Sequence, residues 1–187
     1  MFNRRKKWVR AAMLLEFILM VGCTRPAALP DFSPLQTKVE QLYLNYYELR
    51  VIYSDLRNVG RLQIGRPGEQ LSEIQTAARF IDQANLIAYY QWELLSITDY
   101  IHEDARSDFF TLRAKDIVDA RQKSQDLILA IKVYDAFIHD PAALALIAKG
   151  IEHIEQNVAT FGALYDLMLP LANRPEKPPT AGEQEAL

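Results

Sequence analysis

The sequence predicts an all-α protein, an antiparallel four-helix bundle of long helices with heptad-like seams. Hydrophobic residues make up 50% of the 187 residues, which is enough for a real core. The chain has only 7 glycines, and its 9 prolines lie mainly towards the ends, which argues against a β-sandwich or barrel. Over most of the chain, apolar residues recur at alternating spacings of four and three, the period of a packed helix.

The first helix is predicted to begin at Ser33 and Pro34, an N-cap followed by proline at the first helical position. Gly60 is predicted to end this helix, and residues 60–68, GRLQIGRPG, are predicted to form a loop. The expected core seam of this helix consists of Leu35, Val39, Leu42, Tyr46, Leu49, Tyr53 and Leu56.

The second helix is predicted over residues 71–104, and Asn85 interrupts its apolar stripe. That stripe consists of Leu71, Ile74, Ala78, Ile81, Ala88, Trp92 and Leu95. Ser107 or Asp108 is predicted to cap a third helix. The stripe of the third helix consists of Phe110, Ile117, Ala120, Ser124, Leu127, Ile131, Tyr134 and Ile138.

The fourth helix is predicted to begin at Asp140 and Pro141 and to end at Pro170. Its seam has no polar interruption: Leu144, Ile147, Ile151, Ile154, Val158, Phe161, Tyr165 and Met168. Short connections make neighbouring helices antiparallel, so we expect an up-down bundle over residues 34–172. Residues 173–187 contain too little apolar surface to offset the entropy of ordering, and we expect a disordered tail there.

Residues 1–22 read as an export signal. A basic segment, residues 3–10, precedes an apolar segment, residues 11–22, in which Glu16 is the one charged residue. Twelve helical residues rise only about 18 Å, whereas a hydrocarbon core measures roughly 30 Å. The segment is therefore too short for a transmembrane span.

The apolar segment ends in Met20, Val21, Gly22 and Cys23, and Cys23 is the only cysteine. This ending resembles the lipobox of bacterial prolipoproteins, although Met20 stands where that family usually has leucine. The resemblance implies cleavage before Cys23, acyl chains such as palmitate on its sulfur, and a tether over residues 23–33. Cys23 is followed by Thr24 rather than by aspartate, which resembles enterobacterial lipoproteins that are sorted to the outer membrane. It implies a lipid anchor on the periplasmic face of the outer membrane rather than the inner membrane.

Removal of residues 1–22 leaves 16 basic and 23 acidic residues, a formal charge of −7 (16 minus 23). This acidic balance argues against nucleic acid as a partner, because phosphate binding needs clustered lysine and arginine. It also argues against attachment to anionic lipid through a basic patch. We therefore expect the membrane to be reached through the acyl chains on Cys23.

The sequence offers little catalytic chemistry. A di-iron bundle needs two Glu-x-x-His motifs, and the nearest segment is the single run from Asp99 to His102. His102, His139 and His153 are expected to be exposed or at helix ends. The sequence has no Gly-x-Ser-x-Gly elbow, phosphate-binding glycine loop or His-Glu-x-x-His motif. We therefore expect no catalytic residues, no metal and no cofactor.

Two segments, residues 42–53 and 86–97, are apolar nearly all round the helix. One interpretation is a wide core stripe whose tyrosine hydroxyls reach water. The other is an exposed aromatic surface for an envelope protein or a second copy. Its candidate contact residues are Tyr43, Tyr47, Tyr89, Tyr90 and Trp92.

These features favour a lipid-anchored envelope protein that works by binding, as an adaptor or accessory subunit in the periplasm. A second hypothesis is a bundle with an internal pocket for an apolar ligand or a metal. A third is an envelope enzyme.

Overall fold

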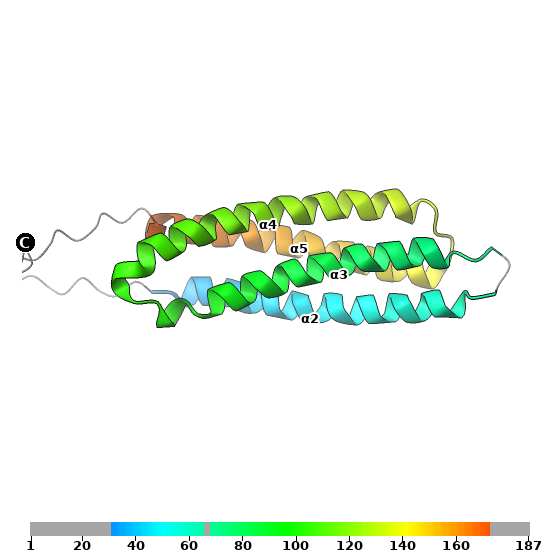
Figure 1. The fold of residues 1–187 in the computed structure, drawn as a ribbon, viewed down its shortest axis with the longest axis horizontal. Helices are drawn as coiled ribbons and strands as arrows, with labels where there is room; N and C mark the ends of the chain where they lie inside the picture. Colours follow the sequence, from blue (N-terminus) through cyan, green and yellow to red (C-terminus); the bar gives the residue numbers. More distant parts are fainter. Residues whose placement is uncertain (1–30, 66–67, 173–187) are drawn as a thin grey trace, which may run out of the picture. The chain divides into compact units, whose positions relative to one another are not determined.

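The computed structural model describes residues 31–65 and 68–172. Figure 1 shows four long helices packed side by side in this part of the chain. The helices are α2 (Ser33–Leu62), α3 (Leu71–Ser96), α4 (Arg106–Asp135) and α5 (Pro141–Ala172). Two 3-10 turns, η1 (Thr98–Tyr100) and η2 (Glu103–Ala105), lie between α3 and α4. The prediction of an all-α bundle is confirmed.

Neighbouring helices run antiparallel. On α2 and α3, the ring of Tyr43 meets that of Trp92, whereas Tyr46, further along α2, meets Tyr89, which comes earlier on α3. The contacts of α2 with α5, of α3 with α4 and of α4 with α5 follow the same rule. In each pair, residues later in one helix meet residues earlier in the other. The helices therefore form the expected up-down bundle, in which α2 and α4 lie on opposite corners.

The core differs from a regular heptad seam in α2. Tyr46 and Tyr53 were expected in the seam but are only partly buried, while Asn45 and Ile52 take the buried positions. An α-helix has 3.6 residues per turn and drifts relative to a 3.5-residue repeat, and α2 packs against two helices at once. The buried face is therefore wider than a single heptad stripe.

The seam of α5 shows the same shift. Ile151 and Val158 pack against the core from its edge, whereas Gly150 and Asn157 are buried. The prediction that no polar residue interrupts this seam is wrong. Asn157 is tolerated there because a second amide on α2 satisfies it.

Four predicted helix ends also differ from the structure. α4 begins at Arg106 with Ala105 as its N-cap, so neither Ser107 nor Asp108 caps it. Gly60 does not end α2 but lies buried within it, where a Cβ atom would stand 3.3 Å from the side chain of Leu71. The helix predicted over 71–104 ends at Ser96, and the chain continues into η1 at Thr98, whose Oγ1 donates to the carbonyl of Leu95 at 2.6 Å. Pro170 lies inside the last turn of α5, where its missing N–H removes only one bond.

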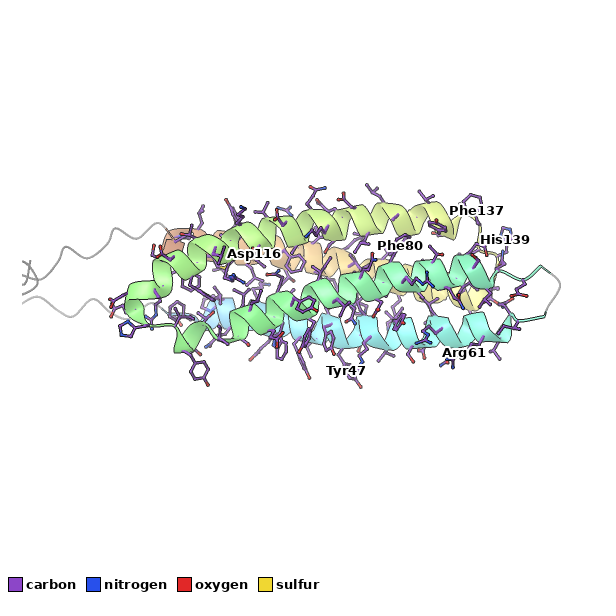
Figure 2. All side chains as sticks on the ribbon, viewed as in Figure 1. Tyr47, Arg61, Phe80, Asp116, Phe137 and His139 are labelled. Carbon is purple, nitrogen blue, oxygen red and sulfur yellow. The ribbon has the colours of Figure 1, made fainter. Side chains whose placement is uncertain are left out.

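Side-chain hydrogen bonds join the two connections at one end of the bundle. Asp140 accepts from the backbone N–H groups of residues 142 and 143 at 2.9 Å each, so it is the N-cap expected for α5. Its other oxygen accepts from Gln63 at 2.7 Å. Gln70 accepts from the backbone of His139 and donates to the carbonyl of Phe137, both at 2.8 Å. Figure 2 shows Phe137 and His139 at this end.

The signal over residues 1–22, Cys23, most of the tether and the tail over 173–187 lie outside the described residues. Among the helices that the structure does describe, none is both long and apolar enough to cross a membrane.

Candidate interaction surface

Aromatic rings from α2 and α3 meet along the contact between these helices. The ring centroids of Tyr43 and Trp92 lie 4.8 Å apart, and those of Tyr46 and Tyr89 lie 5.1 Å apart. Tyr89 also contacts Trp92 at 5.6 Å and Tyr90 at 5.8 Å. The structure thus brings together four of the five predicted contact residues. It adds Tyr46, which the sequence placed in the core seam.

Exposure separates these rings into two groups. Tyr46, Tyr89 and Trp92 are partly buried, which fits the interpretation of a wide core stripe. Tyr43 and Tyr90 are 43% and 55% exposed, and Tyr47, which Figure 2 shows on the outer side of α2, is 57% exposed. We call these six rings the aromatic surface. Its partly buried members contact the rings of Tyr43 and Tyr90.

Apolar aliphatic residues extend the aromatic surface along both helices. Leu44 and Val51 on α2 are exposed, as are Leu86, Leu94 and Ile97 in and just after α3. Single exposed apolar residues are normal, but these five occur on or next to the same two helices as the exposed rings. Both helices therefore present apolar side chains of two kinds to solvent.

Two charged groups act on the tyrosine hydroxyls of the aromatic surface. The carboxylate of Glu93 raises the pKa of Tyr89 above its usual value of 10.0, first by its negative charge and also by accepting a hydrogen bond; partial burial adds to the effect. Arg50 Nη1 donates to the hydroxyl of Tyr46 at 3.0 Å. A phenol with a raised pKa is neutral at neutral pH, so Tyr89 offers a hydroxyl rather than a charge.

A row of arginines continues along α2 beyond the aromatic surface. Arg50, Arg57 and Arg61 are exposed and line a shallow hollow together with Tyr53, Ser54 and Asn58. Arg57 lies 5.6 Å over the ring of Tyr53. Among the described residues, none of these three guanidinium groups forms an ion pair with a carboxylate. The spacing of seven and four residues was a signal for this row in the sequence. It was missed because the net negative charge of the chain argued against a basic patch.

Polar side chains also lie inside the bundle. Asn45 Nδ2 donates to Asn157 Oδ1 at 2.9 Å, and His153 Nδ1 lies 3.4 Å from Asn45 Oδ1. His153 is therefore partly buried beside an amide pair, and the expectation of an exposed histidine is wrong for it. Its ring reaches inward from the flank of α5 because α2 packs directly beside that flank. His102 and His139 are exposed, as expected.

The described residues offer no group of three or more His, Cys, Asp and Glu side chains that could hold a metal ion. Between α3 and α4 lies an open groove of about 510 Å³. Its lining consists of Gln83, Leu86, Ile87, Lys123, Asp126, Leu127 and Ala130. The groove is a surface feature, whereas the second hypothesis expected an internal pocket.

The chain matches no protein-family model, and no curated protein or solved structure shows significant similarity to it.

Proposed function

We propose that this protein is a lipid-anchored adaptor or accessory subunit of the bacterial cell envelope, which binds another envelope protein through the aromatic surface. One observation carries the proposal: aromatic rings of two helices pack against one another at the surface while Tyr43, Tyr47 and Tyr90 remain about half exposed. Tyrosine and tryptophan supply large contact areas at low conformational cost, and protein interfaces are enriched in them.

The contacts between rings also order aromatic side chains before a partner binds. Tyr89 touches three neighbouring rings, so its rotamer is restricted before any partner arrives. Side chains that are ordered in the free protein lose less entropy on binding. An ordered aromatic face therefore supports a binding role better than scattered exposed rings would.

The proposed location rests on the N-terminal sequence alone. Residues 20–23 resemble a lipobox, and Thr24 follows the cysteine that would carry the acyl chains. A tether of about ten residues between the lipid and α2 would let the aromatic surface reach a partner close to the membrane. We place this partner on the periplasmic side of the outer membrane.

Photo-crosslinking in cells tests the adaptor role. The full chain carries a photoreactive phenylalanine analogue in place of Tyr90, and the control chain carries it in place of Leu129, which is exposed on α4. We expect a discrete product with a second, different protein from position 90 and none from position 129. Equal labelling at both positions, or no product from position 90, would contradict the adaptor role.

The groove between α3 and α4 supports a second candidate function, the binding of a single-chain lipid with a zwitterionic headgroup. Leu86, Ile87 and Leu127 would take the acyl chain, and Lys123 and Asp126 would pair with the two headgroup charges. The volume lies within the range of small-molecule sites.

A blocking variant tests this second candidate. Ala130→Trp would fill the groove and abolish binding of a fluorescent lysophospholipid to the purified protein, whereas Ala159→Trp, at an exposed position on α5, would leave it unchanged. Equal binding by both variants would exclude the groove as the site.

A further inference from the structure

The outward side of α2 carries a second seam at heptad spacing. Its members are all exposed, and their spacings alternate between three and four, so they form one stripe along the helix. We call it the outer stripe: Glu40, Tyr43, Tyr47, Arg50, Ser54 and Arg57.

The outer stripe is complementary to itself when it is reversed. About the midpoint between residues 48 and 49, Glu40 is the mirror position of Arg57, and Tyr47 is the mirror position of Arg50. Tyr43 is likewise matched with Ser54. An acid therefore faces a base, and an aromatic ring faces a guanidinium, in each half of the stripe.

We propose that a second copy of this chain packs antiparallel along the outer stripe, with a two-fold axis through that midpoint. A two-fold axis uses the same patch on both copies, so each contact occurs twice. Arg57 pairs with Glu40 of the second copy, and the guanidinium of Arg50 lies over the ring of Tyr47 of the second copy. Arg57 has no carboxylate partner among the described residues, so this pairing breaks no ion pair within the chain.

The charge pattern favours a second copy over an anionic lipid surface. The outer stripe contains an acid at one end and bases at the other, and Glu93 lies beside the aromatic rings. An anionic bilayer would attract Arg50 and Arg57 but repel Glu40 and Glu93. A reversed copy of the same stripe satisfies Glu40 and both arginines.

The contact is of modest size. Overlap of the two α2 helices over residues 36–61 is about 38 Å long and roughly 10 Å wide, a footprint of about 400 Å² per copy. A standard interface covers about 800 Å² per partner. We therefore expect a dimer that dissociates on dilution, and confinement of anchored chains to one membrane would favour it.

This inference goes beyond the proposed adaptor role and does not depend on it. The dimer would cover Tyr43 and Tyr47 of the aromatic surface. Tyr90, Leu94 and Ile97, in and just after α3, lie outside the outer stripe and remain available to a different protein. Loss of the dimer would leave crosslinking at position 90 unchanged if the adaptor role is correct. The two proposals can therefore fail separately.

The test uses two differently tagged copies of the full chain in the same cells, with the photoreactive phenylalanine analogue at position 47. We expect a product that carries both tags. Arg57→Glu alone and Glu40→Arg alone each place like charges opposite one another, and each should reduce this product at least about fivefold. The double variant reverses both charges, restores the pairing and should recover the product. Arg121→Glu, at an exposed position on α4, is the matched control and should have no effect.

Rescue by the double variant distinguishes pairing from misfolding, because two destabilising changes would not restore a product. A product that contains a different protein, adducts to lipid only, or no product with both tags would overturn the proposal. Failure of the double variant to recover the product would overturn the antiparallel register.

Discussion

Asn45 on α2 and Asn157 on α5 hydrogen-bond to each other at 2.9 Å inside the bundle, and both are almost fully buried. A buried amide without a partner costs free energy, so a shift of α2 along α5 would leave two amides unpaired. Buried asparagines select register in this way in coiled coils. The pair therefore favours the observed alignment of α2 and α5 over shifted ones.

Replacement of one member of this pair should cost more than replacement of both. Asn157→Leu leaves Asn45 buried without its acceptor, so we expect the free energy of unfolding to fall by about 1–3 kcal/mol. The double variant Asn45→Leu/Asn157→Leu should recover most of that loss, because leucine has a similar volume and no polar group. Urea unfolding followed by circular dichroism measures both. A double variant less stable than either single variant would refute this account.

Two glycines of α5 should respond to alanine in opposite ways. At Gly150 an added Cβ would stand 2.6 Å from Cδ1 of the buried Ile81, so Gly150→Ala should lose roughly 1–2 kcal/mol despite better helix propensity. At Gly162 the nearest atoms belong to the exposed Arg121 at 3.7 Å, and Gly162→Ala should gain about 0.5–1 kcal/mol. The same unfolding measurement compares them. Equal effects at the two positions would contradict the close approach of α3 to α5 at Gly150.

The pKa of Tyr89 should depend on Glu93. The carboxylate raises this pKa above 10.0, so Glu93→Gln should lower it towards that value. Because the folded chain holds the phenol proton more tightly than the unfolded chain, this group's contribution to stability is present below pH 10 and is lost as pH rises further. An alkaline titration of tyrosinate absorbance, with Tyr89→Phe subtracted, measures the shift. No change in Glu93→Gln would show that Glu93 does not raise the pKa of Tyr89.

Cys23 should be required for acylation. Cys23→Ser removes the thiol that would accept the acyl group, so we expect loss of palmitate labelling and accumulation of the uncleaved chain. Thr24→Ser serves as the matched control and should label normally. Palmitate labelling that persists without Cys23, or a mature protein that begins elsewhere, would refute the lipoprotein hypothesis.

Helix starts and ends were predicted correctly where neighbouring residues gave a strong signal. The start of α5 followed from Asp140 and Pro141, because an N-cap and a proline at the first helical position act within a few residues. The end of α3 was missed because no glycine or proline marks it between residues 96 and 106. Thr98 gives no clear signal, because threonine side chains form similar bonds to backbone carbonyls inside all four long helices.

The candidate surface was predicted only in part. Tyr43, Tyr47 and Tyr90 were recognised because apolar residues occur nearly all round residues 42–53 and 86–97, but the pattern did not show which rings meet. Tyr46 was assigned to the core because its spacing matches the seam, and it lies at the edge instead. The rotation of α2 about its own axis determines whether Tyr46 lies in the core or at its edge. That rotation depends on how α2 packs against both α3 and α5.

The sequence by itself determined the all-α class, because apolar periodicity and helix-end signals depend on residues a few positions apart. Only the tertiary structure decided that Gly60 continues a helix and that Asn157 belongs to the core. Glycine ends a helix by default, but here it lies buried where the first turn of α3 packs against α2. Asparagine is expected at the surface unless a partner is present, and the partner of Asn157 lies 112 positions away in the chain.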